Sequence, residues 1–150
     1  MAEWTAYVPK LATPERVAAW IDNNLWYVAG SAAWRPIEDV LAVRDSFGRQ
    51  YGTCSEAACL FRYALRQLCY KAEIVCIYGE DNARQKVGHA ICVFSSPSGR
   101  GSANWEFIEH YPVSTPWQKI ILSVSPVNEW LATSTEYTDE FGNKLPYVIL

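Results

Sequence analysis

The sequence predicts an α+β fold in which N-terminal helices, including a central cysteine-bearing helix, pack on an antiparallel β-sheet. Apolar residues recur at helical spacing in the first half of the chain, and short β-branched runs follow in the second half. Clusters of Gly, Pro, Asn and Ser separate these runs. The 150 residues are half hydrophobic and contain no repeat or long linker, so we expect a single domain over residues 1–150.

Two helices are expected before the central one. Thr13 and Pro14 have the form of an N-cap and a first helical residue, and the apolar spacing continues to about Val28. Pro36 opens a shorter helix that reaches about Val43. Because tryptophans bury large areas, we expect those of this region in the core: Trp20, Trp26 and Trp34.

The central helix is predicted within Gly52–Tyr70, which reads GTCSEAACLFRYALRQLCY. Thr53 followed three places later by Glu56 is a capping box, which makes Cys54 the first helical residue. Apolar residues at three- and four-residue spacing predict one packed face, with polar residues between them: Glu56, Arg62, Arg66 and Gln67.

Strands dominate the chain after this helix. We expect three antiparallel strands, separated by a polar loop over 79–87 and a hairpin loop over 95–103: Ala72–Tyr78, Gly88–Phe94 and Trp105–Glu109. Three less regular segments are predicted beyond them, namely a strand at Lys119–Val124, a short helix at Pro126–Ala132 and a hairpin at Tyr137–Ile149.

Cys54 is the candidate nucleophile. The partial positive charge at a helix N-terminus favours a thiolate, which is the reactive form of cysteine. A cysteine nucleophile also needs a base within hydrogen-bond reach and a third group that orients the base. His89, at the start of the strand GHAICVF, is the expected base, whereas His110 lies at a strand end beside Pro112.

These residues, in this order, resemble the transglutaminase-like superfamily of papain-related cysteine enzymes. The likeness covers roughly Thr13–Tyr111 and is carried by TPERVAAWI, RPIEDVL, the central helix, GHAICVF and NWEFIEH. It implies a transglutaminase-like or papain-like fold with Cys54, His89 and, four residues after a tryptophan, Glu109 as catalytic residues. The family has Asp more often than Glu at the third position and Gly more often than Cys69 at the left-handed end of the helix.

Two assignments stay open from the sequence. Glu106 and Asn104 are rivals of Glu109 as the orienting group, since an amide has this role in papain-like enzymes. An oxyanion hole requires hydrogen-bond donors, for which the Cys54 backbone amide and the Gln50 side chain are the candidates.

The expected activity is that of a cysteine hydrolase of amide or peptide bonds, either a peptidase or a deamidase, that acts on a protein or peptide through a thioester acyl-enzyme. Three alternatives are a transglutaminase-type acyl transferase, an inactive binding domain with the same fold, and a redox-sensing thiol. The last is disfavoured because no CxxC pair is present.

Composition excludes several other classes. A net charge of −3 without clustered Lys and Arg argues against nucleic acid as a partner. Five unpaired cysteines and only two histidines give no zinc spacing, so we expect no metal, no cofactor and reduced thiols. No signal-like segment or membrane-length apolar run is present, and we therefore expect a cytoplasmic protein.

Overall fold

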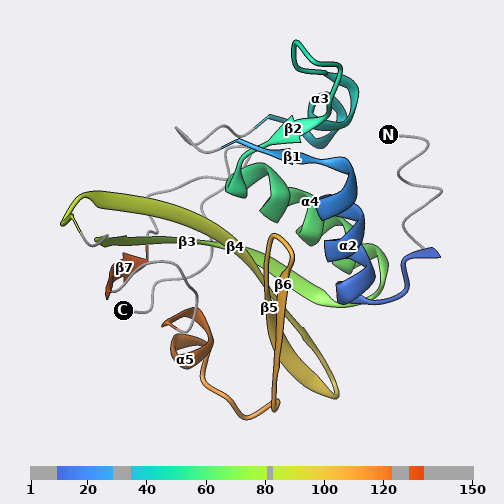
Figure 1. Ribbon diagram of the computed structural model, residues 1–150. Helices are drawn as coiled ribbons and strands as arrows, with labels where there is room; N and C mark the ends of the chain where they lie inside the picture. Colours follow the sequence, from blue (N-terminus) through green and yellow to red (C-terminus); the bar gives the residue numbers. More distant parts are fainter. Residues whose placement is uncertain (1–9, 29–34, 81–82, 123–128, 134–150) are drawn as a thin grey trace.

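The computed structural model describes residues 10–28, 35–80, 83–122 and 129–133, and within these ranges the fold is α+β (Figure 1). An antiparallel sheet of five strands has the order β6-β5-β4-β3-β7, and a short parallel pair, β1-β2, lies beside the helices. The elements are α2 (Pro14–Asn24), β1 (Trp26–Tyr27), α3 (Ile37–Ala42), β2 (Tyr51–Gly52), α4 (Cys54–Gln67), β3 (Lys71–Glu80), β4 (Lys86–Ser96), β5 (Gly99–Asn104), β6 (Phe107–Tyr111), α5 (Trp117–Leu122) and β7 (Glu129–Thr133).

Helix α4 is the centre of the core, between the sheet and the helices α2 and α3 (Figure 1). It begins at Cys54 behind the predicted capping box. The prediction of one packed face is wrong, because Glu56 and Arg62 are only 1% and 6% exposed. Since α2 and α3 cover the side away from the sheet, polar residues of α4 are buried as well. Cys69 has a φ of 69°, which confirms the left-handed residue after the helix.

The two faces of the sheet bury different partners. Alternate residues of β3 and β4 join the α4 core on one face: Ala72, Ile74, Cys76, Ala90, Cys92 and Phe94. Their neighbours form a smaller cluster with Ile121 of α5 on the other face: Val75, Ile77, Ile91 and Val93. Burial is therefore nearly continuous over residues 72–77 and 90–94, and only the face of the sheet alternates from one residue to the next. Cys59, Cys76 and Cys92 are buried in the α4 core.

The expected hairpin loop over 95–103 is wrong, because only Pro97 and Ser98 form a turn and β5 follows at once. Gly101 of β5 lies against the Phe94 ring and the Glu109 backbone, where an added Cβ would come within 2.3 Å and 2.7 Å. Glycine is therefore a packing requirement at this position, although in the sequence it looked like a turn residue.

Helix α2 ends at Asn24, four residues before the expected end. The next residues pair in parallel with Tyr51–Gly52, so sheet pairing takes over where the helical pattern would continue. Trp26 is 55% exposed, with the Arg49 guanidinium 3.9 Å from its ring centroid, and is not a core residue. Trp20 packs against the core, whereas Trp34 lies outside the described residues.

The segments after β6 also differ from the prediction. Residues 117–122 form α5 instead of a strand. Ile120 and Ile121 are both buried, whereas successive residues of a strand with one covered face would alternate between buried and exposed. Residues 129–132 belong to β7, which pairs with β3, and are not helical. The polar loop over 79–87 is shorter than expected, since β3 continues to Glu80 and β4 begins at Lys86. The hairpin predicted over 137–149 lies outside the described residues.

Candidate active site

Cys54 is placed by local structure at both of its sides. The Thr53 hydroxyl accepts the Glu56 amide at 3.4 Å, and the Glu56 carboxylate accepts the Thr53 amide at 3.2 Å, so the helix begins at Cys54. Before the cap, Gly52 leaves room for Leu25 and Glu56, which an added Cβ would approach to 3.2 Å and 3.4 Å. The cysteine is therefore fixed in the first turn, where helix amides have no partner within the helix.

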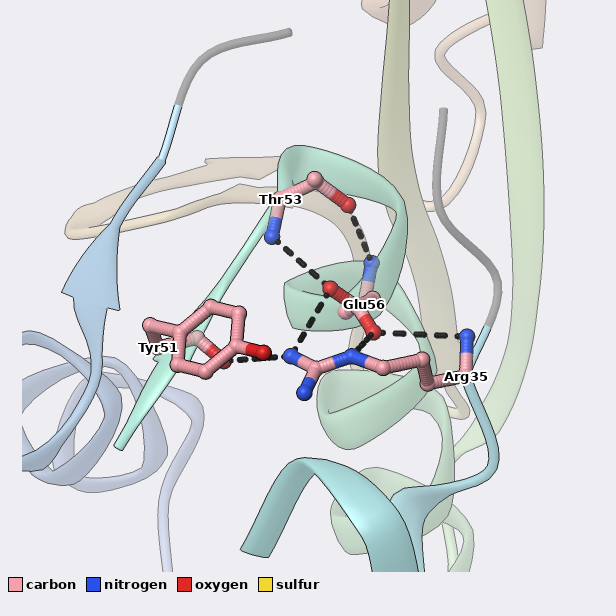
Figure 2. A network of polar contacts seen from close by, with 4 residues as sticks. All are labelled: Arg35, Tyr51, Thr53 and Glu56. Carbon is pink, nitrogen blue, oxygen red and sulfur yellow. Dashed lines mark hydrogen bonds and ion pairs between the residues drawn. The ribbon is translucent and has the colours of Figure 1, made fainter. Parts of the chain in front are cut away.

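An ion pair between the half-buried Arg35 and the buried Glu56 holds this helix start in place (Figure 2). The Arg35 Nε and Nη2 atoms donate to the two Glu56 carboxylate oxygens at 2.5 Å and 3.2 Å. Nη2 also donates to the Tyr51 carbonyl oxygen at 2.6 Å, and the guanidinium lies 4.3 Å from the Tyr51 ring centroid. Arg35 thus ties the strand before Cys54 to the carboxylate that caps the helix.

His89 of β4 and Asn104 of β5 complete a chain of hydrogen bonds that starts at Cys54. The imidazole is hydrogen-bonded to the Cys54 thiol. Its Nε2 atom lies 2.7 Å from the Asn104 Oδ1 atom. Because an amide oxygen only accepts, Nε2 carries the proton in this pair, and Nδ1 is left to face the sulfur. The order thiol, imidazole and amide is therefore present in space.

The electrostatics of the pair favour charge separation. Burial alone raises the pKa of the Cys54 thiol, but the His89 hydrogen bond and charge, with donors from Ala90 and Ser55, lower that pKa below its ordinary value. Burial lowers the pKa of His89, yet the Cys54 hydrogen bond and charge and the Asn104 contact raise it overall. Opposite shifts of this kind stabilise a thiolate beside an imidazolium.

The other buried thiols of the sheet behave differently. Burial, with a smaller effect of the Cys54 charge, raises the pKa of Cys76 to about 12. Burial likewise raises the pKa of Cys92 to about 12. No two of the five cysteines, all of which lie in described ranges, are bonded to each other. Cys54 therefore differs from these two thiols in having an imidazole hydrogen-bonded to it and a pKa below its ordinary value.

A cavity of about 700 Å³ opens beside the Cys54–His89 pair. Residues of α2, β1, α4, β4, β5, β6 and the β5–β6 turn line it: Asp22, Tyr27, Cys54, Ala58, His89, Ala90, Ser102, Ala103, Asn104, Trp105, Glu106, Phe107 and Glu109. Burial and the Cys54 charge raise the pKa of the Tyr27 hydroxyl, so this group stays protonated and can donate a hydrogen bond. A cavity that holds a nucleophile, a base and apolar walls is the usual form of an enzyme site.

The structure separates the sequence candidates. Cys54 and His89 meet as expected, and Asn104 makes the contact to His89 that we expected of Glu109. Glu109 lines the cavity but accepts a hydrogen bond from the Tyr111 hydroxyl at 2.5 Å, so its assignment as the group that orients His89 is corrected. Glu106 also lines the cavity and is exposed.

The remaining candidates lie away from the thiol. Gln50 does not line the cavity, and its amide nitrogen donates to the Leu41 carbonyl oxygen at 2.6 Å, which ties α3 to the segment before Cys54. Its expected place in an oxyanion hole is therefore corrected. His110 pairs with Glu15 of α2 at the surface.

Tyr27 was missed, because only the pairing of β1 with β2 brings it near Cys54 and no local pattern marks it.

No group of three or more His, Cys, Asp and Glu is arranged to hold a metal ion in the part of the chain that the structure describes. In the same ranges, every helix is too short or too polar to cross a bilayer.

Comparisons with known proteins give one distant structural similarity. No family model and no curated protein matches the chain. Among solved structures, the chain is similar to a provisionally assigned cysteine protease from Cytophaga hutchinsonii, with a TM-score of 0.47 and 19% sequence identity. The match covers 67% of this chain and 36% of that protein, so the chain spans little more than a third of its length. The function proposed below therefore rests on the geometry of the site.

The Cys54–His89 pair predicts the pH dependence of alkylation. Because His89 lowers the pKa of Cys54, the rate of iodoacetamide reaction at Cys54 should rise with pH through a midpoint below the value of about 8.5 for a free thiol. In His89→Ala burial, the largest effect on the Cys54 pKa, should outweigh the remaining donors from Ala90 and Ser55, so the midpoint should move above about 8.5 and the rate at pH 7 should fall at least about tenfold. His110→Ala is the matched control and should keep the wild-type profile. Identical profiles for all three proteins would contradict the pairing.

The Arg35–Glu56 pair predicts a large effect on stability. Arg35→Ala leaves a carboxylate that is 1% exposed without its cation, which should lower the free energy of unfolding by on the order of 3 kcal/mol. The control is Arg66→Ala, which breaks the exposed Arg66–Glu73 pair and should cost about 1 kcal/mol or less. Urea titration followed by tryptophan fluorescence measures both values. Equal losses in the two variants would count against a special role of the buried pair.

Proposed function

We propose that this protein is a cysteine hydrolase of amide or peptide bonds, with Cys54 as nucleophile, His89 as acid and base, and Asn104 as the residue that orients His89. The single observation behind this is the continuous hydrogen-bond chain from the Cys54 thiol through the imidazole to the Asn104 amide, at the wall of a cavity of about 700 Å³. Chains of this type activate a thiol and keep the histidine in one tautomer.

Acylation follows from the charge state of the pair. The Cys54 thiolate attacks the carbonyl carbon of the bound amide, which forms a C–S bond and moves the carbonyl π electrons to oxygen. When the oxyanion collapses, the C–N bond breaks and the imidazolium of His89 gives its Nδ1 proton to the leaving amine. The products of this step are a thioester on Cys54, a free amine and a neutral imidazole.

Deacylation reverses the proton movement. Neutral His89 takes a proton from a water molecule, whose oxygen attacks the thioester carbonyl and forms a C–O bond. Collapse breaks the C–S bond, releases a carboxylic acid and restores the thiolate beside the imidazolium. The Asn104 oxygen accepts a hydrogen bond from the Nε2–H group of His89 throughout, so Nδ1 stays directed at the sulfur in both steps.

Two donors are available for the oxyanion. The Cys54 amide belongs to the first turn of α4, where helix N–H groups lack internal acceptors. The protonated Tyr27 hydroxyl, on the cavity wall, is the side-chain donor that we propose in place of Gln50. Donors that are already in place before the charge develops lower the barrier of acyl transfer.

We propose further that the fold is transglutaminase-like. The resemblance seen in the sequence places a cysteine at the start of a central helix and a histidine on a following strand, and both features are present here. The third residue, Asn104, then corresponds to the amide of papain-like enzymes and not to the acid that Glu109 would supply. We expect a peptide or protein substrate, since the chemistry acts on amide carbonyls.

Variants of the third residue separate the two candidates for it. Asn104→Ala should lower kcat/KM for p-nitrophenyl esters of N-acetyl amino acids by about tenfold or more, because His89 loses the group that fixes its tautomer. Glu109→Gln keeps the shape of the side chain and removes its charge, and it should change kcat/KM by less than about threefold when the substrate is neutral. An inverted result would return the orienting role to Glu109. Cys54→Ala gives the background rate.

The fate of the acyl-enzyme distinguishes hydrolysis from transfer. With the same esters and a rising concentration of methylamine, mass spectrometry should find free acid as the main product up to millimolar amine, because the open cavity admits water. Dominant amide at millimolar amine would make the protein an acyl transferase with the same nucleophile. If acyl-Cys54 never forms while Cys54 still reacts with iodoacetamide, the domain binds without catalysis.

A further inference from the structure

The walls of the cavity carry negative charge from three elements. Asp22 comes from the last turn of α2, Glu106 from the β5–β6 turn, and Glu109 from β6. Among the described residues that line the cavity, none is Lys or Arg, and the imidazole of His89 is the only group that can be cationic. Helix α2 also has no basic residue in its last turn, so the partial negative charge of its C-terminus adds to that of Asp22.

Aromatic rings form a corner next to these carboxylates. The centroids of Tyr27 and Trp105 lie 5.0 Å apart, with their planes at 79°. The Trp105 indole nitrogen donates to the Asp22 Oδ1 atom at 3.3 Å, which holds the ring beside a carboxylate. Phe107 adds a third ring to the lining and is 62% exposed. Apolar rings and acidic groups thus line the same cavity, and at Trp105 and Asp22 they are in direct contact.

This combination has a specific chemical preference. The face of an aromatic ring attracts ammonium and guanidinium groups, with Trp as the strongest partner, and a carboxylate nearby attracts the same cation by its charge. The same carboxylates repel an anionic group. A neutral apolar group would gain only the contact with the rings and nothing from the three charges.

The geometry points to a substrate that carries a positive charge, of the lysine or arginine type, next to the bond that Cys54 attacks. This inference rests on the proposed function and names the substrate class for the same cavity. The aromatic corner of Tyr27 and Trp105 receives the cation, and Asp22 and Glu106 set the sign of the charge that is accepted. Charge on the acyl side and charge on the amine side of the bond would be recognised by the same chemistry.

Charged thiol reagents measure the preference without any substrate. Three methanethiosulfonates are compared at Cys54: the cationic 2-(trimethylammonium)ethyl, the neutral methyl and the anionic 2-sulfonatoethyl reagent. Rates come from mass spectrometry of the Cys54 peptide, and each is divided by the rate of the same reagent with 2-mercaptoethanol. The normalised cation-to-anion ratio should be about tenfold or more at low ionic strength and should shrink in about 0.5 M salt, because salt screens exposed charges.

Matched variants assign the effect to the cavity. Glu106→Gln and Asp22→Asn keep side-chain size, and each should reduce the normalised ratio about two- to threefold. Glu38→Gln removes an exposed carboxylate of α3 that does not line the cavity, and it should leave the ratio unchanged. A ratio near one in the wild-type protein, or equal losses in all three variants, would overturn the inference.

Peptide substrates then connect the preference to turnover. Blocked peptides are compared that differ only in Lys, norleucine or Glu at the residue before the scissile bond, and a second set varies the residue after it. Lys should exceed norleucine by about tenfold in kcat/KM in at least one set, which identifies the side that the corner serves, and Glu106→Gln should reduce that advantage. Hydrolysis without any charge preference overturns this inference alone. Absence of hydrolysis together with a preserved reagent ratio overturns the proposed function alone.

Discussion

The site depends on the hydrogen bonds that the buried Glu56 carboxylate makes with Thr53 and Arg35. The carboxylate accepts the Thr53 amide, and it also holds Arg35, which binds the backbone of the strand before the cap (Figure 2). An acidic group with 1% exposure is costly unless its oxygens are satisfied, and here a bidentate guanidinium and a helix amide satisfy them. The first turn of α4 therefore has one start, and Cys54 has one position relative to the sheet.

The sheet supplies the other half of the site at the point where the pairing between β4 and β5 ends. The ladder between β4 and β5 runs only as far as Cys92 and Ala103. Beyond it, the Ala90 amide is available to the Cys54 sulfur, and the side chains of His89 and Asn104 meet. The sulfur therefore has the His89 and Ala90 donors of β4 on one side and the N-terminus of α4 on the other. Both favour the thiolate form of Cys54, although burial alone would raise the pKa of a thiol.

Local features of the site were predictable from the sequence, because they depend on residues within a few positions of each other. The capping box requires only Thr53 and Glu56, and it fixed Cys54 as the first helical residue. The β-branched runs of β3 and β4 predicted both strands, and His89 within the second, since a sheet buried on both faces selects such residues. The left-handed conformation of Cys69 likewise follows from the end of one helix.

The sequence by itself therefore determined the α+β class and the helix start at Cys54, and it pointed to His89, whereas tertiary structure decided which side chain contacts His89 and which residues line the cavity. Glu109 pairs with Ser102, inside the β5–β6 hairpin, while Asn104 pairs with Phe107 beside the turn, where it reaches His89. A count of residues from Trp105 does not reveal this, because the register of a hairpin sets which side chains reach a neighbouring strand. Tyr27 lines the cavity from the two-residue strand β1, whose only signal is its partner strand 25 residues along the chain, in the register Trp26–Tyr51 and Tyr27–Gly52. Such contacts depend on how distant segments fold together, and no local pattern of residues encodes them.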